Sequence, residues 1–217
     1  MTPQMIDRLW QALLDTLFMV SVSAGIAVLC GLPLALFLVT TGPGGIFRAP
    51  AANRVVGAVV NGFRAVPFIV LLVALIPLTR LVTGTTIGVW AAIVPLSVSA
   101  TPFFARIAEV SLREVDAGLV EAAQSIGCRR TQILRHVLLP EALPGIVGGL
   151  TITVVSMIGA SAMAGAVGAS GLGDVAIRYG YQRFDTTVMA VVIAILIALV
   201  CAVQVAGDGA VRWLRAR

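Results

Sequence analysis

Four stretches of the chain contain no charged side chain and are long enough to cross a lipid bilayer. The hydrocarbon core of a bilayer is about 30 Å thick and takes about 20 apolar residues in a helix. The uncharged stretches are residues 16–47, 81–105, 142–173 and 186–207. Within them we expect membrane-spanning helices over approximately 16–39, 84–105, 143–167 and 186–207.

A fifth apolar stretch, residues 65–79, is shorter and lies between Arg64 and Arg80. The apolar residues 55–63 extend it backwards, and an arginine near a helix end can reach the membrane interface with its guanidinium. We therefore expect a fifth span over approximately 57–78. The pattern predicts an all-α integral membrane protein with five transmembrane helices, forming a single domain over residues 1–217.

The arginines predict which way the chain crosses the membrane, because cytoplasmic loops carry an excess of positive charge. With five spans, the 15 basic residues, all arginine, divide eleven to four. The richer side would carry Arg48, Arg54, Arg64, Arg106, Arg113, Arg129, Arg130, Arg135, Arg212, Arg215 and Arg217; the other would carry Arg8, Arg80, Arg178 and Arg183. We expect the N-terminus outside and the C-terminus in the cytoplasm.

The composition excludes several classes of function. Charged residues make up 12% of the chain, about half the usual share of a soluble domain. The basic excess is explained by topology, and no soluble basic face is present for nucleic acid. Because the chain has no lysine, it lacks the phosphate-binding lysine of a Walker A motif and cannot be a conventional ATPase. A single histidine without an H-E-x-x-H motif argues against a zinc site.

One long polar insertion, residues 106–141, separates the third and fourth expected spans. Its pattern predicts two short helices. Asp116 is suited to cap the first helix, in which Leu119, Ala122, Ala123 and Ile126 recur at helical spacing. Gly127 follows where a C-terminal glycine with positive φ belongs.

Thr131 is suited to cap the second helix, and Pro140 is expected to end it. A connection this long and folded, on the cytoplasmic side, favours a docking element for a partner protein. A helix lying on lipid headgroups is the alternative interpretation of the same pattern.

The insertion also contains a spaced motif: E-A-A, three residues, G, nine residues, then V-x-L-P. It comprises Glu121, Ala122, Ala123, Gly127, Val137, Leu139 and Pro140. In this form it resembles the signature of bacterial ABC-importer permeases, with valine in place of the usual isoleucine. Further segments, among them F-R-A-V-P-F-I-V-L-L at 63–72 and G-A-V-G-A-S-G-L-G-D at 165–174, are similar to methionine-importer permeases.

The resemblance implies a type I ABC-importer permease fold in the bacterial inner membrane. It also implies three kinds of protein partner: a second copy of the chain as a homodimer, two cytoplasmic ATPase subunits, and an extracytoplasmic substrate-binding lipoprotein. ATP and Mg²⁺ would bind to the ATPase, not to this chain, which would be a transporter subunit and not an enzyme. The solute would be D- and L-methionine.

Two groups of residues are candidates for function. The motif residues Glu121, Ala122, Ala123, Gly127, Leu139 and Pro140 would couple the permease to its ATPase. In the fourth span, Ser156, Ser161 and Met163 would line or gate the substrate path. Either serine could instead bond back to its own helix, and Met163 could be an ordinary packing residue.

Other functions predict features that this sequence lacks. A secondary transporter commonly places ionisable residues in mid-membrane, and we expect none here. A membrane scaffold would have no use for the spaced cytoplasmic motif, and no catalytic constellation is visible for an enzyme. Within the resembling family, a permease for another amino acid or for an osmoprotectant remains open.

Overall fold

The computed structural model describes residues 3–43, 45–47 and 49–216, in which all regular structure is helical. In chain order the elements are α1 (Pro3–Thr41), α2 (Pro50–Ala65), α3 (Phe68–Ala74), α4 (Ile76–Thr83), α5 (Val89–Arg113), α6 (Ala117–Ser125), α7 (Arg130–Ile133), η1 (Leu134–Leu138), α8 (Leu139–Gly165), α9 (Leu172–Val175), η2 (Ala176–Tyr181) and α10 (Thr186–Arg215). The segments η1 and η2 are π-helical. The all-α prediction is confirmed.

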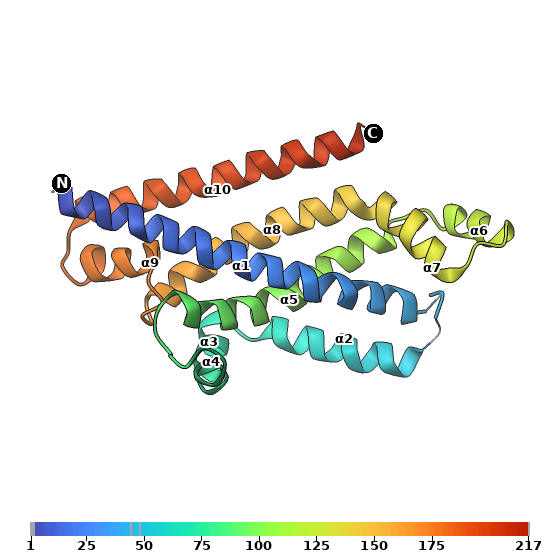
Figure 1. Cartoon of the computed structure of the whole chain (residues 1–217), viewed down its shortest axis with the longest axis horizontal. Coiled ribbons are helices and arrows are strands. Elements are labelled where there is room, and N and C mark those ends of the chain that lie inside the picture. Colours follow the sequence, from blue (N-terminus) through green and yellow to red (C-terminus); the bar gives the residue numbers. More distant parts are fainter. Residues whose placement is uncertain (1–2, 44, 48, 217) are drawn as a thin grey trace.

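Four long helices, α1, α5, α8 and α10, form an elongated bundle (Figure 1). Helix α5 packs against α1 and against α8, and α10 lies along α8. The buried core between them includes Met19 of α1, Leu96 and Ala100 of α5, and Met157 and Ile158 of α8. Each of the four is long and apolar enough to cross a membrane.

Small residues let the central helices lie close together. A Cβ atom added to Gly145 of α8 would lie 2.7 Å from the Ser111 hydroxyl oxygen of α5. One added to Gly31 of α1 would lie 2.9 Å from the Phe104 ring. Contacts this short leave no room for a side chain, so the helix spacing depends on these glycines.

The fifth expected span, over 57–78, is not a single helix. Helix α2 ends at Ala65 and α3 begins at Phe68, with a bend of 104° between them. Pro67 causes the break, because it lacks an N–H and disfavours helical backbone at the preceding residue. Val66 accordingly adopts φ −80° and ψ 126°. The pair α2 and α3 can count as one span only in this broken form.

The polar insertion is also shorter than predicted. Helix α5 continues to Arg113, and a helical segment that begins at Arg130 runs through η1 into α8 without interruption. The ends of the stretch 106–141 therefore belong to long helices, and the irregular connection is limited to residues on either side of α6. A helix that leaves the lipid can continue through charged residues, so charge marks the membrane boundary and not the helix end.

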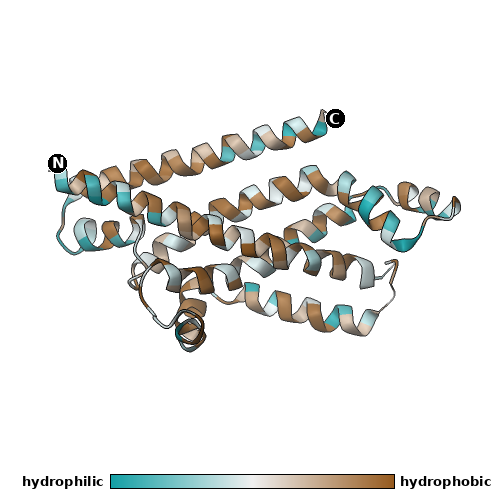
Figure 2. Ribbon diagram, in the orientation of Figure 1, coloured by the Kyte–Doolittle hydropathy of each residue, from teal (hydrophilic) through white to brown (hydrophobic). Residues whose placement is uncertain are grey.

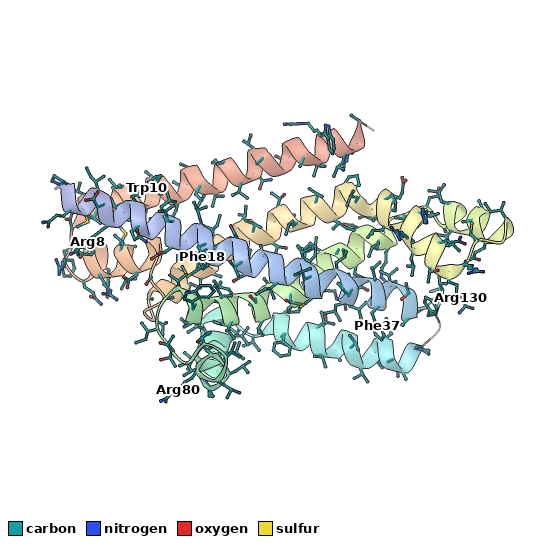
Figure 3. The ribbon with its side chains drawn as sticks, in the orientation of Figure 1. Arg8, Trp10, Phe18, Phe37, Arg80 and Arg130 are labelled. Atoms are coloured by element: carbon teal, nitrogen blue, oxygen red, sulfur yellow. The ribbon has the colours of Figure 1, made fainter. Side chains whose placement is uncertain are left out.

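The two ends of the bundle are polar, and its middle is largely apolar apart from hydrophilic positions on α2 (Figure 2). Figure 3 places Arg8 and Trp10 at one end and Arg130 at the other. The Arg130 guanidinium lies over the Phe47 ring at 5.3 Å, and that of Arg8 lies over the Tyr179 ring at 5.5 Å. Interfacial residues of this kind are typical of the two membrane surfaces.

The two chain termini lie at opposite ends of the bundle, and the α6–α7 hairpin lies at the C-terminal end (Figure 1). This arrangement agrees with an odd number of crossings. Which end faces the cytoplasm remains a prediction from the arginines, of which Arg48 and Arg217 lie outside the described residues.

Candidate functional site

Helix α6 is a short, well-capped helix that projects from the end of the bundle (Figure 1). The Asp116 carboxylate accepts a hydrogen bond from the Gly118 N–H at 2.7 Å, which confirms the predicted N-cap. At the other end, Gly127 has φ +78°. The Gly127 N–H donates to the Gln124 carbonyl and the Cys128 N–H to the Ala123 carbonyl, at 3.0 and 3.1 Å. This is a Schellman motif, and it confirms the role predicted for Gly127.

The two alanines of the E-A-A triplet face opposite sides. Ala123 is buried in the same apolar cluster as Ile133 and Leu138 of the neighbouring helix. Ala122 is exposed, and so are Leu119 at 45% and Ile126 at 80% of their surface. Ala123 therefore packs α6 against the rest of the protein. Leu119, Ala122 and Ile126 form an apolar face, the α6 outer face, that none of the described residues covers.

Glu121 lies beside a cavity of about 410 Å³ between α6 and the ends of α1 and α5. Val39, Arg113, Gln124 and Leu138 are among the other lining residues. Among the described residues Glu121 forms no ion pair, although Arg113 borders the same cavity. Arg113 is instead paired with Glu109.

The second helix of the hairpin differs from the prediction at both ends. Its N-cap residue is Arg129, whose N–H donates to the Gln132 side-chain oxygen at 2.8 Å, and Thr131 lies inside the helix. Pro140 does not end it, because the chain passes through η1 into α8. Pro140 has no N–H to donate, and the π-helical segment η1 before it lets the helix continue without that hydrogen bond.

Leu139 and Pro140 consequently lie inside one rigid rod that links the hairpin to α8. Such a rod can transmit a displacement of α6 and α7 directly into the membrane-spanning part.

A buried carboxylate, which the sequence reasoning missed, fixes the end of α5 beneath this hairpin. Glu109 is 3% exposed and pairs with both Arg106 and Arg113 of the same helix. The Arg106 Nε also donates to the Asn61 side-chain oxygen of α2 at 3.2 Å. The spacing R-x-x-E-x-x-x-R is the signal that could have indicated it, since residues three and four apart share a helix face.

The three candidate path residues of α8 do not form one group. Ser161 is buried, and its hydroxyl donates to the Ile158 carbonyl of its own helix at 2.7 Å. Ser156 is exposed and borders a cavity of about 80 Å³ between α2, α5 and α8. Met163 is also exposed, seven residues further along the same face of α8.

Arg64 borders that cavity too, together with Ser99 and Phe103 of α5. The arginine pattern placed Arg64 at the cytoplasmic end, and the spans were expected to hold no ionisable residue in mid-membrane; the position of Arg64 beside this cavity contradicts both expectations. Ser99 and Ser156 lie near the middle of α5 and α8, and Arg64 lies at their level. The break at Pro67 explains the difference, because it ends α2 half-way along the bundle, where the Arg64 side chain is exposed on the surface and borders the cavity.

Comparison with known proteins adds independent findings. Residues 27–217 match the family described as binding-protein-dependent transport system inner membrane component. The chain is 53% identical, over 95% of its length and 92% of the relative, to a probable D-methionine transport system permease protein of Vibrio cholerae. It is also 39% identical, over 94% of its own length and 91% of the relative, to the methionine import system permease protein of Bacillus subtilis.

A solved structure extends the likeness to three dimensions. A chain of the MetNI methionine ABC transporter, in an inward-facing conformation, superposes with a TM-score of 0.97 at 47% identity and covers 99% of both chains. A chain of an amino acid ABC transporter superposes with a TM-score of 0.80 at 22% identity. The match covers 96% of this chain and 95% of the other, which shows a shared fold.

Proposed function

Because the chain belongs to the family of binding-protein-dependent transport system inner membrane components, we propose that it is the permease subunit of an ATP-driven methionine importer. The solute is methionine, in its D and L forms, taken up across the bacterial inner membrane. This proposal rests on the sequence identity of the chain to two probable D-methionine permeases, 53% to one and 46% to the other, over nearly its whole length.

The energy comes from a separate ATPase, because the chain has no lysine for a Walker A motif. A related solved structure is a MetNI transporter, and ATP and Mg²⁺ belong to the ATPase of such an assembly. The working complex contains two copies of this chain, two ATPase subunits and an extracytoplasmic binding protein. The two copies enclose the substrate path between them.

The α6 outer face is the surface that enters a groove of the ATPase. Leu119, Ala122 and Ile126 supply apolar contact, the small Ala122 allows a close approach, and Gly127 allows the tight turn behind them. Glu121, at the rim, contributes a carboxylate to this interface. These exposed apolar residues lie together on one face of α6, and a contiguous exposed apolar patch supports docking over a purely structural role.

Coupling follows from rigidity. When ATP draws the two ATPase subunits together, each moves the α6 helix that it holds. Leu139 and Pro140 lie within the continuous helical rod from Arg130 to Gly165, so the displacement reaches α8. The docked element thereby biases the permease between inward-open and outward-open arrangements, as alternating access requires.

For the substrate path, Ser156 and Met163 share an exposed face of α8. We place Ser156 beside the path and Met163 at its outer gate, where a flexible apolar side chain can close the opening. Ser161 takes no part in this arrangement, because its hydroxyl is bonded within the helix.

The test is uptake of radiolabelled methionine into vesicles that contain the permease, its ATPase and its binding protein. We expect uptake that requires ATP and all three proteins. Competition by unlabelled amino acids and osmoprotectants identifies the solute. Stronger competition by another solute than by methionine would overturn the methionine assignment and leave the importer assignment in place.

The orientation has its own test. Single cysteines introduced at Thr131 and at Arg183 of a cysteine-free chain are treated with a membrane-impermeant thiol reagent in whole cells. We expect labelling at position 183 and none at position 131. Labelling at position 131 from outside would contradict the docking of α6 on a cytoplasmic ATPase.

A further inference from the structure

Helix α2 carries a positive charge into the middle of the membrane-spanning bundle. Arg64 is in its last turn, next to Ser99 of α5 and Ser156 of α8 around one small cavity. At 1.5 Å per residue, Ser99 lies roughly 15 Å along α5 from its start at Val89. An arginine at this depth is expensive in a membrane, and such residues usually mark a substrate or ion path.

No carboxylate of the chain neutralises this arginine. Every aspartate and glutamate lies within the described residues, and Arg64 forms no ion pair with any of them. Glu109, whose partner Arg106 also reaches Asn61 of α2, is already held by Arg106 and Arg113. Arg64 therefore offers its guanidinium to a group that comes from outside the chain.

The surroundings of Arg64 combine polar and apolar groups. Three hydroxyl side chains border the cavity, those of Ser99, Thr153 and Ser156. Phe63, Phe103 and Met157 supply apolar surface on the same walls. A cavity with one charge, several hydroxyls and an apolar remainder is suited to a small molecule that is charged at one end and apolar at the other.

The break in the helix adds an acceptor. In an unbroken helix the Phe63 carbonyl would accept from the N–H of residue 67, which is a proline and has none. Helix α2 thus ends with free carbonyl groups beside Arg64, and the carbonyl end of a helix favours a positive charge. Broken helices with their ends at a substrate site are a recurrent feature of transporters.

We infer that Arg64 binds the carboxylate of the amino-acid substrate as it crosses the membrane. The carbonyl end of α2 accepts hydrogen bonds from the substrate ammonium group, and the exposed Phe63 ring of α2 contacts its side chain. This inference rests on the proposed function, because it assigns a site to the amino acid that the importer carries.

The cavity, at about 80 Å³, is too small for a whole methionine. The carboxylate fits between Arg64 and the serines, and the rest of the molecule extends along the exposed side of α2. Contact is therefore directed mainly at the part that all α-amino acids share. Selection of the side chain is left to the binding protein.

The inference is tested by removing the positive charge at position 64 and restoring it with a charged thiol reagent. In a chain whose Cys30, Cys128 and Cys201 are replaced by alanine, Arg64→Cys is assembled with the ATPase and the binding protein in vesicles. We expect methionine uptake at least tenfold below that of the cysteine-free parent, with ATP hydrolysis within twofold of it. A methanethiosulfonate reagent that attaches an ammonium group should restore uptake several-fold, and one that attaches a sulfonate should not.

Two further variants serve as comparison. Arg64→Lys should retain more uptake than Arg64→Gln, because lysine keeps the charge but not the two-pronged geometry. Arg54→Gln, near the start of the same helix, should keep uptake within twofold of the parent. Wild-type uptake by Arg64→Gln, or equal rescue by ammonium and sulfonate, would overturn the inference.

Failure of the proposed function has a different signature. If the wild-type complex takes up another solute with a carboxylate, methionine is wrong and the Arg64 series is measured with that solute. If the solute it carries has no carboxylate, the inference is overturned as well. A wild-type complex that imports methionine while the Arg64 variants do so equally well overturns the inference alone.

Discussion

The backbone N–H of Leu172 donates a hydrogen bond to the hydroxyl of Thr16 at 3.0 Å, although the two residues are far apart in the sequence. Leu172 is the first residue of α9, where a helix leaves its N–H groups without partners of its own. Thr16, in α1, thus caps α9 from a different helix. It holds the turn after α8 against the N-terminal half of α1.

Thr16→Val should therefore destabilise the protein. The buried Leu172 N–H would lose its acceptor, which costs about 1–3 kcal/mol. Thr153→Val is the control, because the Thr153 hydroxyl donates to the Gly149 carbonyl of its own helix and caps nothing else. Thermal unfolding in detergent should show a clearly lower midpoint for Thr16→Val. Equal losses in the two variants would contradict the capping role.

Gly127→Glu should insert normally and lose its ATPase. The substitution strains a backbone at φ +78° and places a charge beside the α6 outer face. Gly84→Glu is a matched control, because Gly84 has φ +74° and equally open surroundings in the loop before α5. Co-purification with the ATPase and methionine uptake are measured for both. Retention of both activities by Gly127→Glu would count against docking through α6.

Ile126→Glu probes the same face without backbone strain. Burying an isoleucine contributes about 1.5–3 kcal/mol, so its loss should weaken ATPase binding at least tenfold. The thermal midpoint of the free permease should hardly change, because Ile126 is 80% exposed. Thr131→Glu, also exposed but outside the α6 outer face, should bind normally. Titration of each detergent-solubilised variant with the ATPase measures its binding. Unchanged binding by Ile126→Glu would refute the assignment of the α6 outer face to ATPase docking.

Glu109→Gln should loosen the junction between α5 and α2. Removing one partner of a buried ion pair costs about 3–5 kcal/mol, and the loss here is smaller because the Arg113 side chain is 43% exposed. We expect a thermal midpoint several degrees lower and faster proteolysis near Arg113. Glu114→Gln, which removes an exposed carboxylate nearby, should behave like wild type. Comparable stability of the two variants would show that the Glu109 charge is dispensable.

Several features of this protein follow from the sequence alone. Long uncharged stretches identify α1, α5, α8 and α10, because an apolar helix in a membrane depends only on its own composition. The first hairpin helix follows from Asp116 and Gly127, because capping is a contact within a few residues. The spaced motif that includes Gly127 resembles the signature of the family.

Other features required the tertiary structure. The sequence indicated a proline at position 67 but not a 104° bend, which depends on how α3 packs across its neighbours. The triplet E-A-A did not reveal that Ala123 is buried and Ala122 exposed, because this depends on where Ile133 and Leu138 lie.

The depth of Arg64 is the clearest case. In the sequence Arg64 reads as a charge at the edge of a span, and only the meeting of α2, α5 and α8 places it in mid-bundle. Composition and capping act over a few residues and can be read along the chain. The surroundings of a side chain are set by helices that are distant in sequence, so they are decided only when the bundle is packed.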